Sequence, residues 1–252
     1  MGAVTTGTPR TEAVLRLPCL GPEPLGLDRA LDAVRGYARA TRWQRMRSPG
    51  EPEGHWIQLP AFGWARFDAR PAAAGRDADV LLAEGLHGRL DRAGWHEVHD
   101  ALGRLAPLTD ALRERAAGRS LWELPDEELS VLGESGTVGA LLRTLGRDAG
   151  PHAPHVLAAL HHRHPDLVPH LTRTTRRALL PHLEEGDSGV EAVVHRDLRG
   201  NADAFAELEA AVAAAPDGAR PTRLRLHDVL LWLTTTLRLA HAQDAGRRLR
   251  EE

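Results

Sequence analysis

The sequence predicts a mainly α-helical fold, a compact multi-helix domain with one short aromatic β-hairpin or extended segment. Along most of the 252-residue chain, apolar residues recur with the i, i+3, i+4 spacing that places them on one helix face. Aromatic residues make up only 4% of the chain, so Leu, Ala and Val must fill the core, and Leu and Ala favour helices. The segments between the predicted helices are short, which is typical of helix bundles.

Residues 1–24 carry Gly, Pro and Thr without helical periodicity, and we expect them to form a flexible N-terminal tail. Residues 25–245 are expected to form a single helical domain. Its first helix is predicted over residues 25–47, where apolar residues follow the helical spacing. The Ser-Pro-Gly run at 48–50 should end this helix.

Residues 55–69 differ from the rest of the chain, because aromatic and other residues alternate there on either side of Pro60. Two of the six Trp and two of the three Phe lie in this segment. Alternation of this kind is typical of strands. The segment therefore predicts either a strand pair or an extended aromatic clasp over the helices.

The remaining elements are predicted to be helices. Residues 90–117 should form either two helices or one that breaks near Pro107, with Asp91 and Asp110 as candidate N-caps. Asn201 is a further candidate N-cap. The other helices are predicted over residues 77–84, 125–132, 137–145, 153–163, 167–183, 190–198, 202–215 and 222–243.

The composition excludes several chemistries. All 32 cationic residues are arginine, because the chain contains no lysine, so Schiff-base and P-loop lysines are excluded. The net charge of −3 argues against a globally basic nucleic-acid binder. The single cysteine, Cys19, excludes a disulfide within the chain and a thiolate metal cluster.

The sequence contains no targeting or membrane signal. We find no apolar region of a signal peptide, and no apolar run approaches the roughly 18 residues of a membrane span. We therefore expect a cytoplasmic protein without membrane contact. The high content of Ala, Arg, Gly and Pro is typical of a GC-rich bacterial genome.

Five histidines lie between residues 152 and 164, which raises the hypothesis of a metal site. Zinc needs three or four ligand atoms that converge tetrahedrally. His161 and His164 share a helix face, His155 lies six residues earlier and off that face, and Asp166 adds a carboxylate. These four are the candidate metal ligands. The alternative is a polar helix face, because the spacing matches no common ligand pattern.

The familiar catalytic patterns do not fit the sequence. The run Gly133-Glu134-Ser135-Gly136 is not a nucleophile elbow, and the triplet His195-Arg196-Asp197 lacks the Asn that follows in kinases. Cys19 lies in the predicted tail, which is a poor place for a nucleophile. We therefore predict no catalytic residue and no cofactor.

One part of the chain resembles a helix-hairpin-helix motif. An apolar helix at 141–145 is followed by Gly150-Pro151-His152-Ala153-Pro154-His155-Val156-Leu157, which has the Gly-containing turn, the Ala and the second apolar helix of that motif. In helix-hairpin-helix proteins the amides of the turn face a DNA phosphate. The resemblance therefore implies a helix-hairpin-helix-like element and a nucleic-acid contact by Gly150, His152, Arg163, Arg173, Arg176 and Arg177.

Three segments, 78–83, 160–169 and 224–232, resemble a bacterial family of domains of unknown function that is distantly similar to helix-hairpin-helix DNA glycosylases. The lysine of that family corresponds to Ala158 here, and its aspartate corresponds to Thr172. Those glycosylases use such an aspartate, and sometimes the lysine, for their chemistry. The resemblance therefore does not carry glycosylase activity over. The alternative for the four arginines is that they pair with the acidic residues of 183–219.

The sequence leaves three functions open. The first is a non-enzymatic helical protein with a helix-hairpin-helix-type nucleic-acid contact, for which DNA is the candidate partner. The second is a metal-dependent enzyme that uses the histidine cluster of residues 152–170. The third is a protein-interaction or scaffold domain, in which the six Trp fill the core or anchor an interface. The sequence predicts neither a partner protein nor an oligomeric state.

Overall fold

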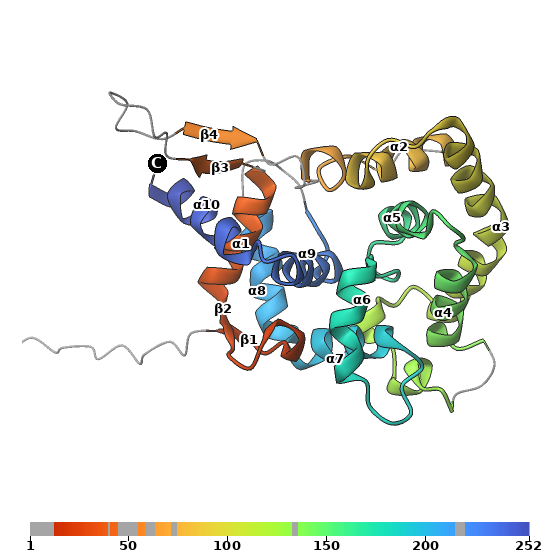
Figure 1. Cartoon of the computed structure of the whole chain (residues 1–252). Coiled ribbons are helices and arrows are strands. Elements are labelled where there is room, and N and C mark those ends of the chain that lie inside the picture. Colours follow the sequence, from red (N-terminus) through yellow and green to blue (C-terminus); the bar gives the residue numbers. More distant parts are fainter. Residues whose placement is uncertain are drawn as a thin grey trace, which may run out of the picture.

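Helices make up most of the chain, so the predicted mainly α-helical fold is confirmed (Figure 1). The computed structural model describes residues 13–39, 41–44, 55–58, 64–71, 75–132, 136–214 and 220–251. Within these ranges the α-helices are α1 (Leu27–Arg39), α2 (Arg76–His87), α3 (Arg92–Ala116), α4 (Val138–Asp148), α5 (Ala153–Arg163), α6 (Arg173–Leu179), α7 (Val190–Gly200), α8 (Ala202–Ala213), α9 (Arg223–Thr235) and α10 (Leu239–Glu251). The strands form two antiparallel pairs, β1 (Val14–Leu15) with β2 (Leu25–Gly26) and β3 (Thr41–Gln44) with β4 (His55–Gln58).

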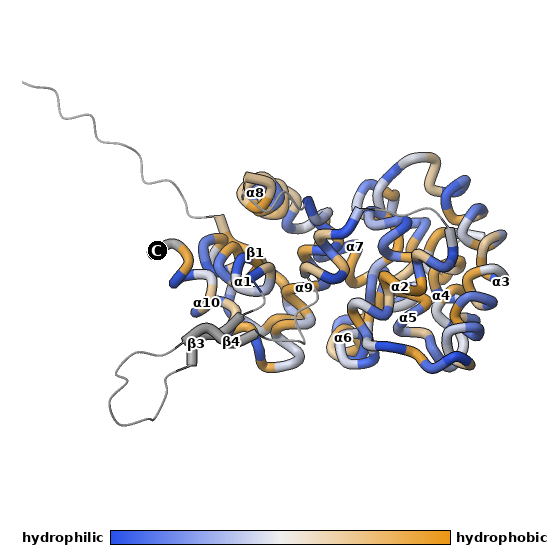
Figure 2. The backbone as a smooth tube through the Cα atoms, turned by 90° about the horizontal axis from the view of Figure 1, so that it is seen from above, coloured by the Kyte–Doolittle hydropathy of each residue, from blue (hydrophilic) through white to orange (hydrophobic). Residues whose placement is uncertain are grey.

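Helix α9 runs through the middle of the molecule. In two perpendicular views, α1, α8 and α10 lie on one side of it and α2 to α5 on the other (Figures 1 and 2). Helices α6 and α7 pack directly against it. Nine of its thirteen residues are buried, and the buried apolar residues of the protein form one connected core from Leu15 to Ala242. A helix that is buried all round places its polar residues inside the protein.

The predicted N-terminal tail is wrong from Ala13 onward. Strand β1 pairs with β2, and both Leu15 and Leu17 are buried. The side chain of Asn201 holds the backbone of Arg16, accepting from its amide at 2.6 Å and donating to its carbonyl oxygen at 3.0 Å. The Gly and Pro residues of this segment therefore shape a turn that the leucines anchor to the core. The earlier part of the predicted tail lies outside the described residues.

The aromatic hairpin exists, but its partner strand differs from the prediction. Strand β4 pairs with β3, which lies inside the helix predicted over 25–47, and Trp43 is opposite Trp56. Residues Trp64–Arg66 form a 3-10 turn instead of a second strand of the 55–69 segment. The Ser-Pro-Gly run at 48–50 lies outside the described residues. The pairing of residues 41–44 with β4 overrides the helical pattern before them.

Helix α3 is a single helix that contains Pro107, so the predicted break is wrong. Pro107 is exposed, and the carbonyl that loses its donor belongs to Gly103, which leaves room for the proline ring. Asp91 caps the helix as predicted, accepting from the amide of Gly94 at 2.7 Å. The predicted cap Asp110 lies within the helix instead.

The helix predicted over 167–183 starts later than expected, since α6 begins at Arg173, beyond Pro169. Its cap is Thr172, whose hydroxyl accepts from the amide of Thr175 at 3.3 Å. The predicted cap Asn201 makes no capping bond for α8, since its side chain holds the N-terminal segment. Thr172 and Asn201 both return below, because each lies at or beside a cluster of functional interest.

The helix predicted over 222–243 is two helices. Helix α9 ends at three threonines whose hydroxyls donate back to carbonyl oxygens one turn earlier, and Leu237 then takes a positive φ of 57°. Helix α10 turns back and packs against α1. The contact is made by glycines, because a Cβ on Gly36 would lie 1.9 Å from the oxygen of Ala242, and one on Gly246 would lie 1.9 Å from the oxygen of Asp32. Among the described residues, no helix is both long and apolar enough to span a membrane.

Candidate functional site

The N-terminal half of α9 carries three buried polar side chains, Arg225, His227 and Asp228. Burying a charged group is unfavourable unless a partner supplies opposite charge or hydrogen bonds. The partners of these three residues therefore show how the protein compensates polar groups in its interior.

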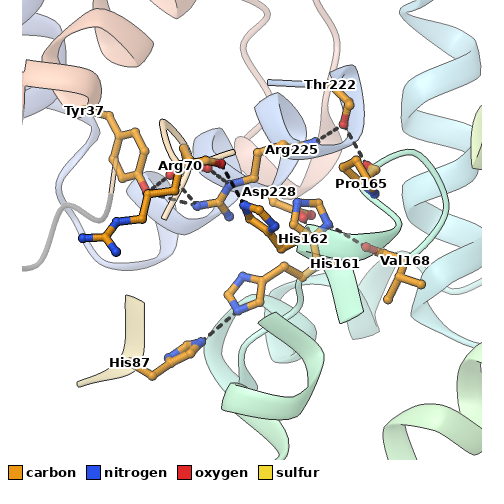
Figure 3. Close-up of polar contacts among 12 residues, drawn as sticks. Tyr37, Arg70, His87, His161, His162, Pro165, Val168, Thr222, Arg225 and Asp228 are labelled. Atoms are coloured by element: carbon orange, nitrogen blue, oxygen red, sulfur yellow. Dashed lines mark hydrogen bonds and ion pairs between the residues drawn. The ribbon is translucent and has the colours of Figure 1, made fainter. Parts of the chain in front are cut away.

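Arg225 is paired with Asp68 and Tyr37. Its Nε and Nη2 donate to the two carboxylate oxygens of Asp68, and Nη2 also donates to the Tyr37 hydroxyl at 3.0 Å (Figure 3). The Tyr37 hydroxyl donates in turn to Asp68 Oδ2 at 3.0 Å. Burial disfavours the charge on Arg225, but Asp68 and Tyr37 outweigh this, so the pKa of Arg225 lies above its usual value. The guanidinium is therefore charged, and Asp68 already neutralises it.

Two histidines, His87 at the end of α2 and His170 before α6, face each other with their Nε2 atoms 2.9 Å apart. One of these atoms must donate a hydrogen bond and the other must accept it. Burial, followed by the charges of His155 and Arg225, lowers the pKa of His87 to about 4. Burial and Arg225 hold the pKa of His170 well below its usual value. Both rings are therefore neutral at neutral pH, and the His170 amide donates to Asp228 Oδ2 at 2.8 Å.

A cavity of about 110 Å³, partly open to solvent, lies where α1, α2, α6 and α9 meet. We call it the ring-lined cavity, because four aromatic rings form much of its wall. Two of these rings, Tyr37 and Trp232, meet edge to face with their centroids 6.1 Å apart. Within the described part of the chain, no carboxylate lines the cavity. Its lining residues are Tyr37, Leu86, His87, His170, Thr172, Thr175, Arg225, Val229 and Trp232.

A turn joins α4 to α5 at the place where the helix-hairpin-helix resemblance puts one. Gly150 is exposed and has a φ of 78°, a value that favours glycine. His152 occupies the N-cap position of α5 and is half-buried, with its Nε2 3.5 Å from Glu97 Oε2 on α3. The side chain of His152 therefore faces α3, and α5 packs mainly against α2 and α3.

Two of the four arginines predicted to contact phosphates are held by buried carboxylates. Arg163 pairs with Asp79, and Arg176 pairs with Glu191 Oε1 at 2.8 Å. Both carboxylates are at most 2% exposed, so these two guanidinium groups neutralise charges inside the protein. The other two arginines, Arg173 and Arg177, are exposed and have no ion-pair partner among the described residues.

The structure does not bring the four predicted metal ligands together. His155 hydrogen-bonds to the Gly88 carbonyl oxygen at 3.0 Å. His161 hydrogen-bonds to the Val168 carbonyl oxygen at 2.6 Å (Figure 3), and burial lowers its pKa. His164 is half-buried and Asp166 is exposed. In the part of the chain that the structure covers, no three of these side chains place ligand atoms within 4.8 Å of one another. Helix α5 ends at Arg163, so His164 and Asp166 lie beyond the helix that carries the other two.

A different trio is gathered, namely Cys19 in the 3-10 turn Pro18–Leu20, Asp197 on α7 and His227 on α9. Each side chain offers one ligand atom, and these atoms all lie within 4.8 Å of one another. Burial raises the pKa of the Cys19 thiol, although His227 opposes this. Burial disfavours the charge on His227, but Asp197 and Asp228 outweigh it, and the pKa of His227 lies well above its usual value.

The sequence did not predict most residues of the ring-lined cavity or of the cluster formed by Cys19, Asp197 and His227. The usable signal was in α9, where charged residues interrupt an apolar run, a pattern that indicates buried polar groups. Cys19 lies between Leu17 and Leu20, which was a weaker sign that the segment is anchored. Tyr37 and His87 lie far from α9 along the chain, and no local pattern links them to it.

Comparison of the chain with family models, with curated proteins and with solved structures gave no match. The function is therefore argued from the geometry of these residues.

Proposed function

We propose that the protein binds nucleic acid without cleaving it, and that the ring-lined cavity accepts one unstacked base. The observation that carries this proposal is the lining of the cavity, in which four aromatic rings and a neutralised guanidinium surround about 110 Å³. A cavity of about 150 Å³ holds a benzene molecule, so the edge of a single pyrimidine is the right size for this partly open space.

The chemistry of the walls favours a planar, uncharged group. Aromatic side chains stack on bases whatever their sequence. Because Asp68 already neutralises Arg225, the cavity offers no net positive charge to a free anion. The neutral rings of His87 and His170, together with the hydroxyl of Thr172, supply hydrogen-bonding groups for the edge of a base.

Helix α6 connects the cavity to a surface suited to phosphates. Thr172 and Thr175 line the cavity, while Arg173 and Arg177 lie one turn apart on the exposed face of the same short segment. Phosphates on either side of an inserted base would meet these two guanidinium groups. Phosphate contacts of this kind position a protein on a strand without reading its sequence.

Binding without cleavage follows from what the cavity lacks within the described residues. Thr172 stands where the resemblance places the aspartate of the glycosylases, and no carboxylate lines the cavity. Asp68, whose carboxylate faces this network, is bound to Arg225 and Tyr37. Among the described residues, no carboxylate is therefore placed in the cavity wall to assist cleavage of a glycosidic bond.

The proposal is tested by fluorescence anisotropy with labelled oligonucleotides over a salt series. We expect a duplex with one unpaired base to bind more tightly than a fully paired duplex. The double variant Arg173→Ala/Arg177→Ala should lose about two phosphate contacts, which lowers the slope of log K against log salt by about 1.8. The matched control is Arg89→Ala/Arg92→Ala, which removes two exposed arginines, one in the loop before α3 and one at its first residue, and should leave the slope unchanged.

A second variant separates the cavity from the phosphate contacts. Val229→Phe fills the ring-lined cavity from α9 and should remove the preference for the unpaired base while the salt slope stays the same. Equal binding of both duplexes by the unaltered protein, or no binding at low salt, would overturn the proposal. Circular dichroism of each variant shows that it is folded before its affinity is compared.

A further inference from the structure

We propose that Cys19, Asp197 and His227 form a binding site for a divalent transition metal, best suited to zinc, apart from the ring-lined cavity. The three residues come from three separate segments, yet their ligand atoms lie within 4.8 Å of one another. Nitrogen, sulfur and oxygen ligands in one site are the mixture that zinc accepts. A thiolate and a carboxylate together neutralise a divalent cation, which matters because Asp197 and His227 are buried.

The distances suit ligands around one ion. Asp197 Oδ2 lies 3.0 Å from His227 Nε2 and 3.5 Å from Cys19 Sγ. Around tetrahedral zinc, with bonds of about 2.0 Å to nitrogen and oxygen and about 2.3 Å to sulfur, neighbouring ligand atoms lie roughly 3.3–3.6 Å apart. At these two distances, shifts of at most a few tenths of an ångström would match the spacing around the ion, and the third pair, Cys19 Sγ and His227 Nε2, lies within 4.8 Å.

The arrangement is that of a metal site and not of a nucleophile relay. In a relay the imidazole lies between thiol and carboxylate and presents one nitrogen to each. Here a single oxygen of Asp197 contacts both Cys19 Sγ and His227 Nε2. Three ligand atoms gathered within 4.8 Å of one another are what a bound cation requires.

Beside the proposed site, two buried atoms without hydrogen bonds have the arrangement that often supports a metal-bound histidine. His227 Nδ1 and Asp228 Oδ1 both lack a hydrogen-bond partner, and they lie 3.9 Å apart. A metal-bound imidazole usually donates its other N–H to a carboxylate. A metal on His227 Nε2 would place the ring hydrogen on Nδ1, facing Asp228, so the small movement that closes this gap satisfies both atoms.

The fold holds the site and leaves access to it. Asn201 donates to the carbonyl oxygen of Asp197 at 2.8 Å and also holds the backbone of Arg16, so it fixes the turn that carries Cys19 against α7. Cys19 is half-buried, which gives an ion a path from solvent. Three protein ligands leave one tetrahedral position for water, as in open zinc sites.

The test is a cobalt titration of the full chain after removal of metals with a chelator. We expect one equivalent of cobalt to bind and to produce thiolate-to-cobalt charge-transfer absorption, which zinc then abolishes by displacement. The chain has a single cysteine, so this absorption in the unaltered protein identifies Cys19 as the ligand without any variant. Absence of the absorption from folded protein would overturn the proposal.

Variants sharpen the assignment. Cys19→Ser should abolish the charge-transfer absorption, and Asp228→Asn should weaken zinc binding by about 10–100-fold through the orientation of His227. The matched control His96→Gln alters an exposed histidine of α3 and should leave zinc affinity unchanged. Zinc affinity in Asp228→Asn equal to that of the unaltered protein would show that Asp228 plays no part. All measurements are made without nucleic acid, so their result does not depend on whether the proposed base-binding function is correct.

Discussion

Arg225 and Asp68 neutralise each other in the core beside the ring-lined cavity. Removing one charge of a buried pair leaves the other without compensation, which costs about 3–5 kcal/mol. We therefore expect Asp68→Asn to lower the free energy of unfolding by that amount in urea denaturation. The control is Glu209→Gln, because the pair of Glu209 with Arg223 is more exposed and should cost about 1 kcal/mol or less. Equal losses in the two variants would contradict the argument.

Buried histidines make the stability of the fold depend on pH. Burial, with the nearby charges of His155 and Arg225, lowers the pKa of His87 to about 4, and burial also lowers the pKa of His161 and His170. In the unfolded chain a histidine has its ordinary pKa of about 6.5. Below that value the unfolded chain binds protons that the folded protein excludes, so the stability that these three histidines contribute is full above about pH 6.5 and is lost as the pH falls toward 4.

Urea denaturation at several pH values between about 7 and 5 checks this expectation. The free energy of unfolding should decrease as the pH falls, and His87→Gln should make the decrease shallower by removing one of the groups that titrate. The same substitution at the exposed His96 should leave the slope as it was. A stability that rises toward pH 5 would show that other groups dominate.

At the scale of elements, local patterns predicted the helices whose ends are encoded nearby. Helix α5 has the predicted bounds, 153–163, because Pro154 favours its first turn and Pro165 follows its end. The pattern failed where a distant segment decides the structure. Residues 41–44 follow directly on a helix and become a strand only because 55–58 pair with them. Pairing across a loop cannot be derived from the spacing of apolar residues within one segment.

The pairing of α1 with α10 depends on two glycines. Any side chain at Gly36 or Gly246 would meet a backbone carbonyl of the other helix at 1.9 Å, so the two helices would have to move apart. We expect Gly36→Ala and Gly246→Ala each to lower the free energy of unfolding by at least about 1–3 kcal/mol. These substitutions should also increase the rate of amide hydrogen exchange more in α10 than in α7.

A glycine elsewhere provides the control for these substitutions. Gly200 ends α7, is exposed, and has no atom within 4 Å of the position that a Cβ would take. Gly200→Ala should therefore leave stability unchanged or raise it slightly, because alanine restricts the unfolded chain. A loss at Gly200 as large as that at Gly36 would mean that helix contact is not the cause.

At the scale of the whole molecule, the two segments that carry the family resemblance, 160–169 and 224–232, lie close together. Thr222, two residues before the second segment, donates from its hydroxyl to the Pro165 carbonyl oxygen at 2.8 Å (Figure 3). Tyr37 completes the ring-lined cavity from the other side of α9. The position of Tyr37 in the cavity wall could not be predicted from the sequence, because only the packing of α1 against α9 brings it to the cavity.

The contact between α1 and α10 also has a consequence for how the protein is made. A chain emerges from the ribosome from its N-terminus, so α1 is synthesised more than two hundred residues before the helix that covers it. Contacts this distant in sequence slow folding, because a long loop must close before they form. Tyr37, one residue from Gly36, has its partners Arg225 and Trp232 on α9, which is synthesised only just before α10. The ring-lined cavity is therefore a late product of biosynthesis, and a nascent chain lacking α10 would expose its glycine-lined face to chaperones and proteases.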